Sequence, residues 1–98
     1  MAAVEQRLTE LGYTLPASSK PLAAYIPAVQ TGNLVFTSGQ LPMVEGSLAQ
    51  SGKVGAEVTA ERAKELATIC ALNALAAIKT AIGDLDKVKR VVKVVGFV

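Results

Sequence analysis

Ser38 and Gly39 are the residues of this 98-residue sequence best placed to do chemistry. They follow Leu34 to Thr37, a β-branched and aromatic run that predicts a strand. Pro42 then closes the segment, because proline has no N–H for a strand ladder. A strand that ends in Ser-Gly can present a hydroxyl and bare backbone amides to a small ligand. The alternative is an ordinary turn after a hairpin, and spacing alone favours that alternative.

Other groups able to do chemistry are scarce. The sequence has no histidine, which excludes imidazole metal sites and Ser-His or Cys-His nucleophile pairs. Its single cysteine, Cys70, falls in an apolar helical stripe and is predicted to be a buried structural thiol rather than a nucleophile. Glu61 and Glu65 are one helical turn apart beside basic residues, which is typical of a solvated helix surface. We expect no metal site.

Composition predicts one small domain over residues 1–98, with 51% hydrophobic and 18% charged residues. The net charge of +2 is too small to indicate nucleic-acid binding. The one basic cluster also has no aromatic residues between its members, which are Lys87, Lys89, Arg90 and Lys93. The single cysteine and the lack of a signal-type leader predict a cytoplasmic protein. Asn73 and Lys79 interrupt the long apolar helix, so we expect no membrane span.

The elements before Ser38 are predicted from local signals. Val4, Leu8 and Leu11 recur at helical spacing, and Gly12 is a typical helix end. Prolines make the segment 13–27 irregular. Its Tyr25 could cover a ligand, although packing on a neighbour is the commoner role of a loop tyrosine. Gly32-Asn33 predicts a hairpin that pairs residues 28–31 with residues 34–37.

The elements after Ser38 are a glycine-punctuated segment and a long helix. Residues 43–58 are predicted to be a weak strand or loop. Thr59 is a good N-cap, and the helix runs to Ile82 and stops at Gly83. Its predicted core stripe consists of Ala63, Leu66, Ala67, Cys70, Ala74, Ala77 and Ala81.

A final strand is predicted over Val88 to Val98, with large aliphatic side chains on both faces. One helix can cover only one face of the resulting sheet, so we expect copies of the chain to cover the other face. The sequence stops within this apolar strand, which suggests a domain that is incomplete at its C-terminus.

The chain resembles the RidA/YjgF family of reactive-intermediate deaminases, also known as endoribonuclease L-PSP. The resemblance starts with Tyr25 and Ala28-Val29 and continues through the run Gly32-Asn33-Leu34-Val35-Phe36-Thr37-Ser38-Gly39-Gln40-Leu41-Pro42. The alanine-rich helix from Thr59, the Gly83 stop and the run from Asp84 to Val88 then follow in the family's order. The shortest members of the family lack the leading helix, so the chain resembles a subgroup with longer sequences.

The resemblance implies an α+β, chorismate-mutase-like fold, with a sheet, a long helix packed on one face, and a trimer. It also implies that a C-terminal helix-strand unit is missing. Its activity would be hydrolysis of enamines and imines to 2-keto acids and ammonia, without metal or cofactor, in a cleft between subunits. Tyr25, Ser38 and Gly39 match residues that line this cleft. The family's arginine, which pairs with the substrate carboxylate, has no counterpart here, because Arg7, Arg62 and Arg90 lie in other contexts.

A second hypothesis assumes the same trimeric scaffold without the deaminase reaction, since fold does not determine function. The protein would then be a non-catalytic protein that binds small ligands or partners. A ribonuclease function is the weakest hypothesis, because no histidine and no basic aromatic groove support it.

Overall fold

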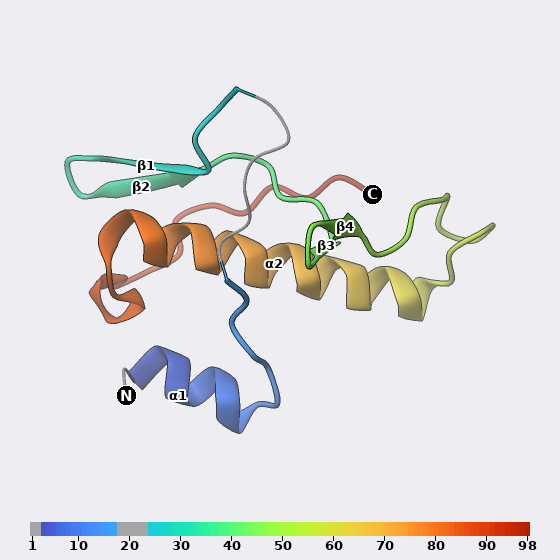
Figure 1. The fold of residues 1–98 in the computed structure, drawn as a ribbon, viewed down its shortest axis with the longest axis horizontal. Helices are drawn as coiled ribbons and strands as arrows, with labels where there is room; N and C mark the ends of the chain where they lie inside the picture. The colour runs from blue at the N-terminus through green and yellow to red at the C-terminus, as the bar shows by residue number, and fades with distance from the viewer. Residues whose placement is uncertain (1–2, 18–23) are drawn as a thin grey trace.

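The computed structural model describes residues 3–17 and 24–98, and these residues form an α+β fold around one long helix (Figure 1). Two small antiparallel hairpins and a short 3₁₀ turn pack against that helix. The elements in chain order are α1 (Ala3–Glu10), β1 (Ala28–Thr31), β2 (Leu34–Thr37), β3 (Met43–Val44), β4 (Ser47–Leu48), α2 (Ala60–Ile82) and η1 (Leu85–Lys87).

The β1–β2 hairpin confirms the predicted pairing and its bounds. Val29 lies opposite Phe36, and Thr31 opposite Leu34. Gly32 has a positive φ of 56°, whereas Asn33 does not, and this is the φ pattern of a type II′ turn with glycine first. The turn matches the twist of the strands, which is why four residues on each side pair in register.

The β3–β4 hairpin replaces the weak strand or loop predicted for this region. Met43 pairs with Leu48 and Val44 with Ser47. The turn between them has φ values of 50° at Glu45 and 84° at Gly46. Glutamate rarely adopts a positive φ, so Glu45-Gly46 is a weak turn signal in a sequence.

Helix α2 has the predicted bounds and caps. The Thr59 side chain accepts a hydrogen bond from the Arg62 backbone N–H at 3.0 Å, as an N-cap does. At the other end Gly83 has a φ of 90° and its N–H donates to the Lys79 carbonyl. Glycine adopts this conformation without strain, which ends the helix there.

The buried face of α2 is rotated from the predicted stripe. Asn73, Ala76 and Ala77 are buried, whereas Ala67 and Ala81, which were predicted to be in the core, are exposed. The prediction gave weight only to apolar side chains, but the buried face includes Asn73, whose side chain donates to the carbonyls of Leu41 and Met43. Ala77 is the predicted core residue that is fully buried.

The predicted strand over Val88 to Val98 is wrong for the described chain. After η1 this segment forms no strand, and residues 89–98 make no backbone hydrogen bond to any other described residue. Phe97 is 95% exposed. A strand needs a neighbour to satisfy its N–H and C=O groups, and the described part of the chain offers this segment none.

Helix α1 lies on the surface, as predicted, and contains no buried residue. In Figure 1 it lies on one side of α2 and the β1–β2 hairpin on the other. Its first amides, those of Ala3 and Val4, donate to the two carboxylate oxygens of Asp86, each at 2.8 Å. Lys79 of α2 also pairs with Glu5 at 2.6 Å. Polar contacts therefore join α1 to the turn after α2.

Helix α2 is also long and apolar enough to cross a membrane, judged by length and composition. Core helices of soluble proteins pass the same test. Here α2 packs against β1, β2 and η1 and buries Asn73.

Candidate functional site

Ser38 lies directly after β2, where its backbone and its side chain contact the same atom. The Ser38 N–H donates to the Pro27 carbonyl at 2.9 Å, and the Ser38 hydroxyl lies 3.3 Å from that oxygen. This contact extends the β1–β2 pairing by one step, because Ala28 is opposite Thr37. The hairpin therefore determines where the predicted Ser-Gly pair lies.

The Ser38 hydroxyl is suited to binding rather than to nucleophilic attack. It donates to Pro27 and accepts from the Gln40 amide, whose Nε2 lies 3.4 Å from Ser38 Oγ and 3.4 Å from Ser38 O. No histidine exists in the sequence to remove its proton. Gln40, which sequence reasoning did not single out, therefore belongs to the site as the side chain that orients Ser38.

Gly39 opens a short run of free backbone donors. Among the described residues, the N–H groups of Gly39, Gln40 and Leu41 have no hydrogen-bond acceptor. A Cβ built on Gly39 would meet nothing within 4 Å. Gly39 and Leu41 are exposed and Gln40 is half-buried. This run, residues 38–41, is called the Ser38 loop below, and its donors are of the kind that bind a carboxylate or hold a water molecule.

Tyr25 lies two residues before Pro27, the residue whose carbonyl contacts Ser38. The Tyr25 side chain is exposed and makes no hydrogen bond to another described residue. Because Pro27 is bonded to Ser38, the three predicted site residues Tyr25, Ser38 and Gly39 come from two segments that meet at Pro27. Tyr25 therefore lies on the segment whose Pro27 carbonyl contacts Ser38.

Asn73 connects this region to the core. It is 7% exposed, and its Nδ2 donates to the carbonyls of Leu41 and Met43, each at 3.1 Å. The sequence contains a signal for this role: a lone amide one turn from Ile69 and Ala77, at the helical spacing of a buried face. Buried polar side chains are normally hydrogen-bonded, so such an amide predicts a backbone partner.

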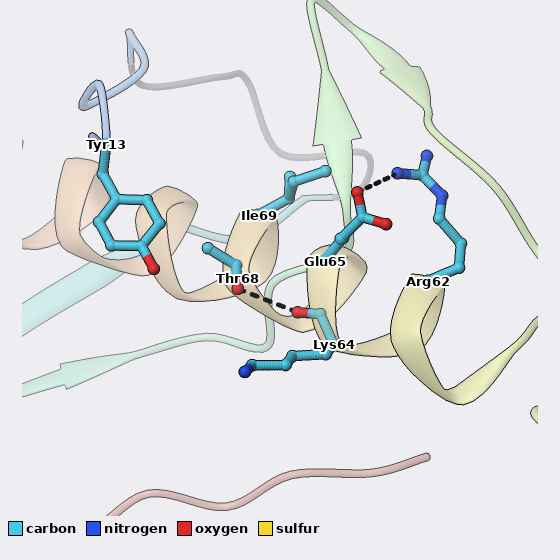
Figure 2. A pocket seen from close by; sticks show the side chains of 6 residues that line it. All are labelled: Tyr13, Arg62, Lys64, Glu65, Thr68 and Ile69. Atoms are coloured by element: carbon cyan, nitrogen blue, oxygen red, sulfur yellow. Dashed lines mark hydrogen bonds and ion pairs between the residues drawn. The ribbon is translucent and has the colours of Figure 1, made fainter. Parts of the chain in front are cut away.

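A shallow groove of about 470 Å³ lies elsewhere, between Tyr13 and the first half of α2 (Figure 2). Two of its charged groups, Arg62 and Glu65, pair with each other at 3.6 Å. Arg62 also donates from Nε to Gln50 at 2.8 Å. The Thr68 hydroxyl donates to the Lys64 carbonyl of its own helix at 2.9 Å. None of the predicted site residues lines this groove, so it is not the candidate site.

The other reactive groups lie outside the Ser38 loop. Arg7 pairs with Glu10 on the surface of α1, and Arg90 is exposed in the segment after η1. Cys70 is half-buried, and desolvation raises the pKa of its thiol, which makes the thiolate scarce and agrees with a structural role. Within residues 3–17 and 24–98, no three side chains of the metal-binding types gather into a possible metal site.

A family model matches residues 5–98 of the chain. Its description is "YjgF/chorismate mutase-like, putative endoribonuclease". The match includes the hairpin, the Ser38 loop and all of α2. It covers far more than half of the sequence.

Three relatives show the same likeness. Protein TCP17 of Trypanosoma cruzi is 39% identical over 95 residues, which cover 97% of this chain and 59% of that protein. The crystal structure of Atu1372 from Agrobacterium tumefaciens, of unknown function, has a TM-score of 0.76 and 46% identity, over 90% of this chain and 52% of that one. The crystal structure of a "putative endoribonuclease" from Shewanella oneidensis MR-1 has a TM-score of 0.77 and 35% identity, over 84% of this chain and 54% of that one. The chain thus spans somewhat more than half the length of these relatives.

Proposed function

Since this chain belongs to the YjgF/chorismate mutase-like family, we propose that the protein is a deaminase that hydrolyses reactive imines and enamines in a cleft between subunits. The reaction converts a C=N bond and water into a 2-keto acid and ammonia. Water oxygen bonds to the carbon, the C–N bond breaks, and the nitrogen leaves as ammonia after taking up protons. The protein is proposed to act in the cytoplasm.

The observation that supports this proposal best is the meeting of two segments at Pro27. It brings the Ser38 hydroxyl beside a run of N–H donors that no described residue occupies. Such donors suit the carboxylate of a small 2-imino acid and the water that attacks it. Tyr25 is proposed to lie at the mouth of this site, with Ser38 and Gly39 lining it.

Self-association is part of the proposal. Val29 and Phe36 share the outer face of the hairpin and are 48% and 54% exposed. Leu34, on the same face, is 45% exposed. The opposite face, with Ala28 and Val35, is half-buried against α2. An exposed apolar strand pair of this kind favours contact with another chain, and we propose a homotrimer with the site between copies.

A non-catalytic binding protein is the second candidate. The observation in its favour is that the Ser38 hydroxyl already has two partners and that no charged base contacts it among the described residues. In that case the Ser38 loop would bind small carboxylates without turnover.

The test is keto-acid release from 2-aminoacrylate, generated in place by a serine dehydratase. We expect the full-length protein to accelerate release, and Ser38→Ala to lower the rate by about tenfold or more because one orienting hydroxyl is lost. Thr37→Ala, next to Ser38 on β2, is the control and should retain activity. Carboxylate binding without acceleration would support the second candidate, and cleavage of RNA alone would reject both.

A further inference from the structure

Asn73 is the buried polar residue of the described chain. Its side-chain amide donates hydrogen bonds to the segment that follows Ser38. At 7% exposure its side chain has lost nearly all contact with water. Burial of an amide is unfavourable unless it is hydrogen-bonded. Both of its bonds go to carbonyls 32 and 30 residues earlier in the chain, those of Leu41 and Met43.

The segment between β2 and β3 has few other anchors. Ser38 is bonded to Pro27 at its start, and the Ala49 N–H donates to the Pro42 carbonyl near its end. Pro42 has no N–H, and the Met43 N–H reaches only Leu41, two residues back. Among these contacts, only those made by Asn73 join the segment to α2.

The chemistry of asparagine suits this double contact. One amide nitrogen carries two N–H donors in a fixed plane, and here they meet two carbonyls that flank Pro42. A serine hydroxyl has one donor, and leucine has none. Because this nitrogen belongs to a residue of the rigid helix α2, its two hydrogen bonds can hold the segment at a fixed distance from the helix.

We propose that Asn73 is a positioning residue, which holds the Ser38 loop in its binding geometry through the carbonyls of Leu41 and Met43 without touching the ligand. The importance of that geometry rests on the proposed function, since displacement of a binding group by about 1 Å can weaken its action about a hundredfold. The role of Asn73 in ordering the loop can be measured separately.

The experiment compares Asn73→Leu with the unaltered chain by backbone ¹⁵N relaxation. Leucine has the same branched arrangement of heavy atoms and removes both donors. We expect order parameters at Gly39, Gln40 and Leu41 near about 0.85 in the unaltered chain and below about 0.6 in Asn73→Leu, with α2 unchanged. The control Ala77→Gly weakens the same helix without removing a side-chain hydrogen bond, and should leave the loop ordered.

Pyruvate, the simplest 2-keto acid, is the binding probe for the same variants. We expect Asn73→Leu to weaken its binding by about tenfold or more, and Ala77→Gly to leave it unchanged. A loop that is equally ordered in Asn73→Leu, or already disordered in the unaltered chain, would overturn the inference. If the unaltered chain does not bind pyruvate, the proposed function fails, whereas the order parameters still decide the role of Asn73.

Discussion

Gly39 is a glycine that the described chain does not itself require. Its backbone does not adopt the positive φ that excludes other residues, and a Cβ there would contact nothing. Gly32 differs, because its φ of 56° belongs to the hairpin turn. We propose that Gly39 leaves room for the ligand of the Ser38 loop.

This contrast gives a prediction at the residue scale. Gly39→Val should change the free energy of unfolding by less than about 0.5 kcal/mol, as a substitution without clashes does, yet abolish pyruvate binding. Gly32→Ala should show the reverse, with a loss of about 1 kcal/mol from strain and binding retained. Urea unfolding and calorimetric titration measure both effects. Unchanged binding in Gly39→Val would place the ligand elsewhere.

At the scale of elements, the N-cap of α2 can be tested directly. Thr59→Ala removes the oxygen that accepts the Arg62 N–H at 3.0 Å, and should lower the free energy of unfolding by about 1 kcal/mol. Thr59→Ser keeps a hydroxyl and should lose much less. Urea unfolding of the two variants decides this, and equal losses would show that the hydroxyl is not what matters.

The attachment of α1 should depend on pH. Hydrogen bonds from the Val4 and Ala3 backbone amides hold the pKa of Asp86 below its usual value. A carboxylate with a lowered pKa stabilises the docked helix above its ordinary pKa, and that stabilisation disappears as the pH falls through the lowered value. We therefore expect α1 to be docked at pH 7 and to loosen below about pH 4, which ¹⁵N order parameters along α1 will report.

Two variants separate this attachment from general effects of acid. Asp86→Asn keeps one acceptor oxygen but no charge, so α1 should be looser at pH 7 and should respond less to acid. Arg7→Gln removes the pair with Glu10, which lies wholly within α1 at 3.2 Å, and should behave like the unaltered chain. An Asp86→Asn protein with a fully ordered α1 at pH 7 would contradict the assignment.

The elements that could be predicted from the sequence are those with local signals. Gly32-Asn33 between two β-branched runs placed the first hairpin, and Thr59 and Gly83 placed both ends of α2. The segment 88–98 has equally strong strand residues but is unpaired, because pairing depends on a distant partner rather than on composition. The likeness to a known family pointed to Ser38 and Gly39. The spacing of Asn73 on its helix indicates a buried amide, whereas its partners, the carbonyls of Leu41 and Met43, became visible only through contacts 30 or more residues apart.

At the scale of the whole molecule, the exposed outer face of the hairpin should control association. Phe36→Glu places a charge among Val29 and Leu34 and should convert an assembly to a monomer of 10.1 kDa. Thr37→Glu adds the same charge to the other face of β2 and should leave the mass unchanged. Sedimentation equilibrium measures the mass, and an assembly that survives Phe36→Glu would place the interface elsewhere.

We propose that imine hydrolysis takes place at the Ser38 loop once copies of the chain have assembled around it. The most direct test of this proposal is the rate of keto-acid release per chain, measured with the molar mass across a dilution series. We predict that the rate and the mass fall together as the trimer dissociates. A constant rate from a chain that stays monomeric throughout, or a stable trimer that releases no keto acid, would contradict the account.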